Sequence, residues 1–338
     1  MTAAAERPAI ALDVMGGDRA PEATIEGAIG WARSTGQRAI LVGDVDVMRG
    51  LLSSGGEDPS AWRLESGPTT IGMDEHPVQA VRSTRDASIR RCAELVRSGE
   101  AQALVSMGNT GATMAAGVLV VGRAAGVDRP GLAVLIPGRE APTLLIDVGA
   151  NSEARPEHLR DFGLMGEVYL RQVLGTPNPR AGVLSIGEEA TKGSPLTLAA
   201  AELLAASPLD FVGNIEPGGL FNSSADVVVC DGFTGNLVLK SFEATAEFAV
   251  GELRAAVRRR PYTLPGVVFM YPAFRAVRRR TDYAQYGGTP LLGVNGVVII
   301  GHGRSNAMAV ENALNAAARA VESRVVERVS DGLALTDR

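Results

Sequence analysis

The sequence has 338 residues, 46% of them hydrophobic and 21% charged, which are the proportions of an ordinary packed globular protein. Its formal net charge of −5 argues against general nucleic-acid binding, which calls for a basic surface. Two cysteines (Cys92, Cys230) and three histidines (His76, His158, His302) are too scattered for a disulfide framework or a zinc site. The composition therefore predicts a globular protein without a structural metal.

The first eight residues carry Glu6 and Arg7 and contain no apolar stretch of the kind that begins a secretory signal. The sequence thus predicts a cytoplasmic protein, in a reducing compartment that suits its two unpaired cysteines.

Short apolar runs recur along the chain, and each ends in a glycine-bearing turn that leads into a helical pattern. The predicted strands are residues 9–14, 39–42, 103–106, 144–148, 182–186, 227–230 and 297–300. Because these runs are continuously apolar, the strands should be buried on both faces, as in a mostly parallel sheet between two helix layers. No linker or repeat divides the chain, so we predict one α/β domain over residues 1–338.

Glycine-rich loops follow several of these strands and carry Asn, Thr or Ser. In a parallel sheet such loops meet at the carboxyl ends of the strands, where free N–H groups bind anions. Four or five loops of this kind at one edge favour a phosphate-like ligand. The alternative is that each glycine only serves a tight turn.

Three familiar catalytic motifs are absent. Residues 187–194 resemble a P-loop, but Lys192 precedes Gly193, whereas a P-loop has glycine before lysine. No dinucleotide fingerprint follows the first strand, and no nucleophile elbow occurs anywhere. Cys230 closes an apolar run with no histidine nearby in sequence, so we interpret it as a buried structural cysteine.

Residues 258–280, RRRPYTLPGVVFMYPAFRAVRRR, form an aromatic segment between two arginine triplets. The apolar periodicity of residues 233–259 predicts one long helix, which Pro261 and Pro265 end. Pro272 can open a second helix that extends to Arg280, so residues 233–286 are predicted to form a projecting helical hairpin. The apolar part is too short and too interrupted to cross a membrane, which takes about 20 residues.

Six short motifs occur in a fixed order along the chain. They are Asp13–Asp18 with Pro21, Ser106–Ala112, Asp147–Asn151 with Pro156–Leu159, Ile186–Glu189 with Lys192–Gly193, Cys230–Asn236, and Leu291–Gly293 through Gly301–Gly303. Together they resemble the bacterial phosphate acyltransferase family of phospholipid synthesis, from about residue 8 to residue 325.

The resemblance implies transfer of a fatty acyl group from acyl carrier protein to inorganic phosphate, giving acyl phosphate. It implies a three-layer α/β/α sandwich similar to isopropylmalate dehydrogenases and phosphotransacetylases. It also implies a homodimer that works at the inner face of the cell membrane without a metal or organic cofactor. The sequence departs from the family pattern at Thr84, Arg85 and Ala87, and Ser152–Arg155 lacks the usual cysteine.

Phosphate that attacks a thioester needs an anion site and charge stabilisation at the carbonyl oxygen, and it needs no enzyme nucleophile. The predicted phosphate-binding residues are Gly16, Gly17, Thr110, Gly111, Gly149 and Ala150. The predicted charge partners are Arg82 and Lys192. The candidate donors to the thioester oxygen are Asn109, Asn151 and His302; the alternative for His302 is a residue that only starts a helix. We expect Asp18, Asp147 and Asp231 to cap loops and orient the arginines.

The predicted hairpin is a basic island in an acidic protein, with eight arginines between Gly251 and Gly287 against Glu252 and Asp282. This net charge of +6 suits an anionic membrane surface, and acyl carrier protein is also acidic. The predicted contact residues are Arg258, Arg259, Arg260, Phe269, Phe274, Arg278, Arg279 and Arg280. A hairpin that packs only against its dimer mate is the alternative.

Two other functions remain open from the residues. One is an NAD-dependent 2-hydroxy acid dehydrogenase on a related fold, which the missing dinucleotide fingerprint disfavours. The other is a non-catalytic scaffold that binds acyl carrier protein at a membrane surface, which leaves the glycine-rich loops unexplained.

Overall fold

The computed structural model of the protein describes residues 8–281 and 287–334. The strands are β1 Ile10–Asp13, β2 Ile40–Gly43, β3 Leu64–Ser66, β4 Ala103–Ser106, β5 Gly131–Ile136, β6 Thr143–Ile146, β7 Arg180–Leu184, β8 Asp210–Ile215, β9 Val227–Val229, β10 Thr289–Leu292 and β11 Val297–Ile300. The α-helices are α1 Glu22–Thr35, α2 Val45–Ser54, α3 Pro77–Ser83, α4 Ser88–Ser98, α5 Thr110–Ala116, α6 Pro156–Val173, α7 Pro195–Ala205, α8 Gly232–Arg259, α9 Leu264–Thr281, α10 Ala307–Glu322 and α11 Val325–Ala334. Short helical turns are η1 Pro59–Ala61, η2 Gly117–Val121, η3 Pro217–Leu220 and η4 Pro261–Thr263.

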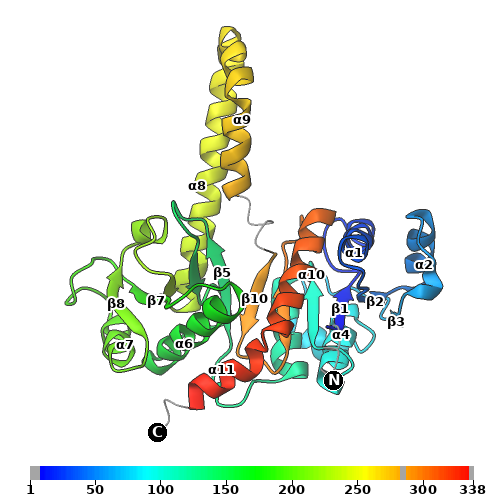
Figure 1. Ribbon diagram of the computed structural model, residues 1–338, viewed down its shortest axis with the longest axis horizontal. Coiled ribbons are helices and arrows are strands. Elements are labelled where there is room, and N and C mark those ends of the chain that lie inside the picture. Colours follow the sequence, from blue (N-terminus) through cyan, green and yellow to red (C-terminus); the bar gives the residue numbers. More distant parts are fainter. Residues whose placement is uncertain (1–7, 282–286, 335–338) are drawn as a thin grey trace, which may run out of the picture.

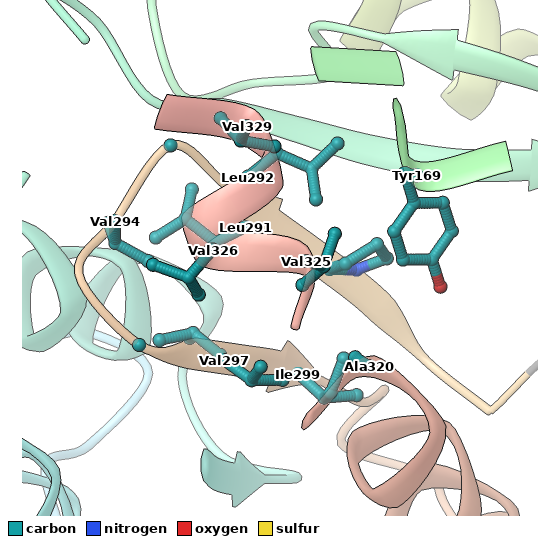
Figure 2. A pocket seen from close by; sticks show the side chains of 14 residues that line it. Tyr169, Leu291, Leu292, Val294, Val297, Ile299, Ala320, Val325, Val326 and Val329 are labelled. Atoms are coloured by element: carbon teal, nitrogen blue, oxygen red, sulfur yellow. The ribbon is translucent and has the colours of Figure 1, made fainter. Parts of the chain in front are cut away.

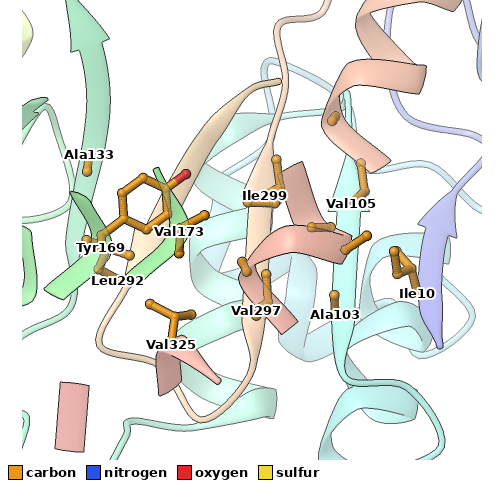
Figure 3. Packing of buried hydrophobic residues seen from close by; sticks show 14 of the residues in the cluster. Ile10, Ala103, Val105, Ala133, Tyr169, Val173, Leu292, Val297, Ile299 and Val325 are labelled. Atoms are coloured by element: carbon orange, nitrogen blue, oxygen red, sulfur yellow. The ribbon is translucent and has the colours of Figure 1, made fainter. Parts of the chain in front are cut away.

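All of these strands belong to one sheet, in the order β3-β2-β1-β4-β11-β10-β5-β6-β9-β7-β8. Successive residues of a strand face opposite sides of the sheet. Leu144 and Ile146 accordingly join a core with α1, α6, α10 and α11, whereas Leu145 joins a second core with α3, α4 and α5. Figure 3 shows part of the first core, where Val297 and Ile299 of β11 lie close to Val105 of β4. The predicted three-layer α/β/α sandwich is confirmed.

The strand directions divide the sheet into two parallel blocks. The first contains β3, β2, β1, β4 and β11, and the second contains β6, β9, β7 and β8. Between the blocks, β10 is antiparallel to β11 and β5, and β5 is antiparallel to β6. The two blocks therefore run in opposite directions. We call the carboxyl ends of β1, β4 and β11 the first rim, and those of β6, β9 and β7, at the opposite side of the sheet, the second rim.

Each of the seven predicted strands corresponds to a strand of the sheet, and four other strands were not predicted. These four are β3, β5, β8 and β10. None of them ends in the glycine-rich turn and helix on which the prediction relied. Two of them, β5 and β10, are the strands that reverse the direction of the sheet. The predicted glycine-rich loops therefore divide between two edges, with those after β1, β2, β4 and β11 at one and those after β6, β7 and β9 at the other.

Helices α8 and α9 form the predicted hairpin and project from the body of the molecule (Figure 1). The first part of α8 packs on the second core through Val238 and Leu239. Helix α9 begins at Leu264 and contains Pro272, so the prediction that Pro272 opens the second helix is wrong. Pro265 lies in the first turn, where backbone N–H groups have no helical partner, and Pro272 removes only one hydrogen bond.

Within the described ranges, no helix is long and apolar enough to span a membrane. This finding agrees with the prediction made from the length of the aromatic segment.

Candidate functional site

The three loops of the first rim are bonded to one another. The N–H of Asp18, after β1, donates to the carbonyl of Gly303, after β11, at 2.8 Å. The N–H of Gly301 donates to the carbonyl of Ser106, at the end of β4, at 2.8 Å. A Cβ atom on Gly16 would lie 2.9 Å from the backbone nitrogen of Gly108, closer than real Cβ contacts come. Glycine at position 16 thus lets the first two loops touch.

Several predicted phosphate-binding groups meet at this rim. Gly17 has a φ of 115°, which favours glycine, and it lies between the loops that follow β4 and β11. In the described part of the chain, the N–H groups of Gly17, Thr110 and Gly111 donate to no other residue. Helix α3 packs on α5, with Pro77 at its start against Gly111, and Arg82 lies exposed in its last turn. The three N–H groups supply unused donors.

Asn109 and His302 also lie at the first rim. The side-chain oxygen of Asn109 caps α5 by accepting the N–H of Ala112 at 3.1 Å, and its amide donates to the carbonyl of Gly72 at 2.8 Å. This leaves Asn109 with one further amide proton. His302 Nδ1 accepts the N–H of Arg304 at 3.1 Å, which assigns the ring proton to Nε2. Burial lowers the pKa of His302, so the ring is a neutral donor at neutral pH.

The loop after β6, at the second rim, is folded around the carboxylate of Asp147. Asp147 accepts hydrogen bonds from the N–H groups of Leu132, Gly149, Ala150 and Asn151 and from the Asn151 side-chain amide, at 2.7 to 3.1 Å. The predicted donors at Gly149 and Ala150 are therefore bonded to a carboxylate of the protein itself. Burial raises the pKa of Asp147, and these donors oppose the rise.

The acidic site residues at the second rim act as caps, and within the described part of the chain neither of them bonds to an arginine. Asp147 caps its own loop, and Asp231 caps α8 by accepting the N–H of Thr234 at 2.9 Å and its hydroxyl at 2.7 Å. These bonds go to backbone, amide and hydroxyl groups rather than to arginine. Asp18, at the first rim, instead binds the neighbouring loop through its backbone N–H.

The other two predicted site residues of the second rim have different environments. Both protons of the Asn151 amide are used, by the carbonyl of Pro130 at 2.7 Å and by Asp147. Lys192 is exposed, and its backbone carbonyl accepts from Ser185 Oγ at 3.2 Å and from Asn214 Nδ2 at 3.0 Å. The loop that presents the Lys192 ammonium group is thus fixed, and the side chain reaches solvent.

Helix α8 connects the two rims. Its first N–H, of Gly232, donates to the carbonyl of Asn151 at the second rim at 2.8 Å. Further along, Glu247 lies 3.7 Å from Arg304 at the first rim.

Between these contacts, Gly149 of the second rim lies beside Asn236 of α8. His302 of the first rim lies close enough to Lys240 and Glu243 of α8 for their charges to act on its ring. The predicted site residues therefore come from two rims that both contact α8, and a single phosphate cluster built from both stays a prediction.

Two small cavities differ in chemistry. The first, of about 20 Å³, lies between β10, β11 and α11, and Figure 2 shows its wall of valine and leucine side chains with Tyr169 at one side. Burial raises the pKa of Tyr169 to about 12, so its hydroxyl stays protonated. A void of this size with apolar walls is a packing defect of the core. The second cavity, of about 10 Å³, lies at the first rim, and because polar side chains make up much of its mixed wall we call it the polar cavity.

Beside the predicted Gly16 and Asn109, the wall of this cavity contains polar residues that the sequence did not single out as site residues. Asp13, Ser88 and Ser106 are all buried and come from the ends of β1 and β4 and the start of α4. A signal for Asp13 was present, because a carboxylate that closes a fully apolar strand is costly to bury. Among the described residues, no group of histidine, cysteine and acidic side chains could hold a metal ion.

The fold and its glycine-rich rims place the protein in a structural class that includes phosphotransacetylases. The structure resembles a phosphotransacetylase from Streptococcus pyogenes with a TM-score of 0.64 and 14% identity, over 96% of this chain and 95% of that one. A putative 4-hydroxythreonine-4-phosphate dehydrogenase from Salmonella typhimurium gives a TM-score of 0.54 and 14% identity, over 93% and 99% of the two chains. At such identities the likeness shows the fold alone.

The family follows from sequence comparison. Residues 9–328 match the model of a family described as "Fatty acid synthesis protein". The chain is 46% identical to the phosphate acyltransferase of Desulforudis audaxviator over 332 residues, which cover 96% of each chain. The chain belongs to the phosphate acyltransferase family, as its six motifs predicted.

Proposed function

We propose that this protein transfers a fatty acyl group from acyl carrier protein to inorganic phosphate for phospholipid synthesis. A phosphate oxygen attacks the thioester carbonyl, the carbon–sulfur bond breaks, and the carrier thiolate leaves and takes up a proton. The products are acyl phosphate and free carrier. Membership of the phosphate acyltransferase family carries this proposal.

We place the phosphate at the first rim. The N–H groups of Gly17, Thr110 and Gly111 make no hydrogen bonds within the described chain, whereas those of Gly149 and Ala150 are used by Asp147. A bound phosphate at the first rim would gain donors without displacing a carboxylate. This favours Gly17, Thr110 and Gly111 over Gly149 and Ala150, with Arg82 as the charge partner. The Gly16 N–H interacts with Asp13, so we assign Gly16 to shaping the loop.

The neutral His302 ring is our candidate for stabilising the thioester oxyanion, and the spare amide proton of Asn109 is a second donor. Asn151 has no spare amide proton in this structure, which counts against the same role. Lys192 lies at the other rim. We assign Lys192 to binding the carrier protein. The phosphopantetheine arm of the carrier bears an anionic phosphodiester that the Lys192 ammonium group can bind, and the arm can extend along α8 toward the first rim.

One assay separates this function from its alternatives. Purified protein is mixed with acyl carrier thioester and phosphate, and acyl phosphate is trapped with hydroxylamine. We expect acyl hydroxamate to form without NAD. A nicotinamide absorbance change with a 2-hydroxy acid would indicate a dehydrogenase, and carrier binding without hydroxamate would indicate a scaffold.

Removing the two predicted charge partners should have different effects. We expect Arg82→Ala to raise the phosphate KM by about tenfold, the size of one lost charged hydrogen bond. Lys192→Ala should raise the KM for the acyl carrier thioester by a similar factor and leave the phosphate KM unchanged. Arg97→Ala, at an exposed position in the last turn of α4, is the control. Unchanged kinetics in both variants would exclude this site.

We further propose that the enzyme works as a homodimer at the inner face of the cell membrane, with the α8–α9 hairpin as its contact. The hairpin exposes Phe269 by 85% and Tyr262 by 78%, and Arg258, Arg259 and Arg260 end α8. Phe274 is half-buried. The side chains of Arg278, Arg279 and Arg280 lie outside the described residues. Exposed rings among arginines suit the headgroup region of an anionic bilayer.

Flotation with liposomes tests the hairpin. We expect wild-type protein to float with anionic vesicles, and the double variant Phe269→Glu, Phe274→Glu to remain in the soluble fraction, because each change adds a charge that the headgroup boundary disfavours. Met308→Glu, at an exposed apolar position on α10, should float like the wild type. Equal flotation of the double variant and the wild type would contradict the proposal.

A further inference from the structure

A buried carboxyl group lies directly beneath the loops of the first rim. Asp13, the last residue of β1, is only 2% exposed. Its Oδ2 accepts the Ser106 hydroxyl at 2.7 Å, and Ser106 Oγ in turn accepts the N–H of Gly108 at 3.1 Å. Within the described chain, Asp13 Oδ1 has no hydrogen-bond partner. Asp13 therefore connects the β1 loop to the β4 loop with one of its oxygens and leaves the other unused.

The polar cavity lies against this carboxyl group. Its wall includes Asp13, Ser88, Ser106, Asn109 and Thr113, and its volume of about 10 Å³ is close to the least that holds one water molecule. A Cβ atom on Gly16 would lie 2.6 Å from Asp13 Oδ2, so the β1 loop closes directly over the carboxyl group. The loop that carries Gly16 and Gly17 therefore rests directly on the Asp13 carboxyl group.

Among the residues that the structure describes, no cationic side chain faces this carboxyl group. The side chains that face it are Ser88 and Cys92 of α4, Ser106 of β4, and Asn109 and Thr113 at the start of α5. All of them are uncharged. Burial raises the pKa of Asp13 above its ordinary value, and nearby hydroxyl and backbone N–H groups oppose the rise. A carboxylate buried without a cation is disfavoured relative to the neutral acid.

We propose that Asp13 acts as a neutral carboxylic acid that positions the phosphate-binding loops of the first rim. Oδ2 accepts the Ser106 hydroxyl, and the proton on Oδ1 is donated into the polar cavity. The neutral form leaves no negative charge beneath the N–H groups of Gly17, Thr110 and Gly111, where a carboxylate would repel the phosphate dianion. This inference rests on the proposed function and adds to it a positioning residue.

The isosteric variant Asp13→Asn tests the proton on Oδ1. Asparagine keeps an oxygen for Ser106 and a donor toward the cavity, so we expect kcat/KM for phosphate to stay within about threefold of the wild type. Asp13→Ala removes both groups and should lower kcat/KM about tenfold, as expected for a lost buried hydrogen bond. If Asp13→Asn loses as much activity as Asp13→Ala while remaining folded, an ionised carboxylate is required and the proposal is wrong.

A second measurement does not depend on activity. The infrared spectrum of the wild type at its working pH should contain the carbonyl stretch of a protonated carboxyl group that the spectrum of Asp13→Asn lacks. Identical spectra in that region would overturn the proposal. A wild-type protein that forms no acyl hydroxamate would instead contradict the proposed function, and the infrared result would still decide the state of Asp13.

Discussion

Replacing Asp147 by alanine should lower the free energy of unfolding by about 3–5 kcal/mol, the loss expected when several buried donors lose one charged acceptor. Asp147 accepts from four backbone N–H groups and one amide, and it is fully buried. Alanine leaves these donors without their partner in a site that water reaches poorly. Chemical denaturation, followed by circular dichroism, measures the change.

Two companion variants sharpen this measurement. Asp147→Asn keeps the acceptor for Leu132, Gly149 and Ala150 and loses the one for Asn151, so we expect a loss between those of the wild type and Asp147→Ala. Asp46→Ala removes an exposed carboxylate from a surface ion pair and should change the unfolding free energy by less than about 1 kcal/mol. A loss for Asp147→Ala no larger than that for Asp46→Ala would show that Asp147 does not hold the second rim together.

Gly17→Val should lower kcat/KM for phosphate about 100-fold, the effect of removing one well-placed oxyanion donor. A residue with a side chain rarely adopts the φ of 115° found here. A Cβ atom would also lie 3.2 Å from the Cβ and the carbonyl oxygen of Met107. The loop must therefore shift, and the Gly17 N–H moves away from the proposed phosphate. Steady-state kinetics with varied phosphate measure the loss.

A control variant at Gly36 distinguishes the effect of backbone strain on stability from an effect on phosphate binding. Gly36 ends α1 with a φ of 70°, and a Cβ atom added to it would have no neighbour within 4 Å. Gly36→Val should cost about 1–3 kcal/mol of stability through backbone strain and leave turnover unchanged. If Gly17→Val loses only stability, as Gly36→Val does, the first rim is not the phosphate site.

Local sequence patterns account for much of the fold. Apolar runs that end in glycine-rich turns located β1, β2, β4, β6, β7, β9 and β11, because burial on both faces leaves a continuous apolar signal. The periodicity of residues 233–259 located α8 to within one residue. The strands β3, β5, β8 and β10 were missed because they lack that combination of a turn and a helix. Their pairing depends on distant partners.

In the helical hairpin, too, local sequence patterns predicted only part of the structure. The arginine triplets and prolines indicated a break near Pro261, and the chain does turn at η4. The sequence also suggested that the second helix begins at Pro272, whereas α9 begins at Leu264 and continues through Pro272. A proline disfavours a helix locally, and the residues on both sides can still extend it when the loss is one hydrogen bond.

By itself, the sequence determined the class of fold, the family and the loops that carry polar groups, because each depends on residues close together in the chain. Only the tertiary structure decided which loops share a rim. The antiparallel strands β5 and β10 turn the second half of the sheet around, so Gly149, Ala150 and Lys192 follow strands that run opposite to those before Gly16, Gly17 and His302. Strand direction is set by pairing between segments far apart in sequence. The hydrogen bond from Leu132 to Asp147 and the burial of Asp13 likewise depend on residues that are distant in sequence.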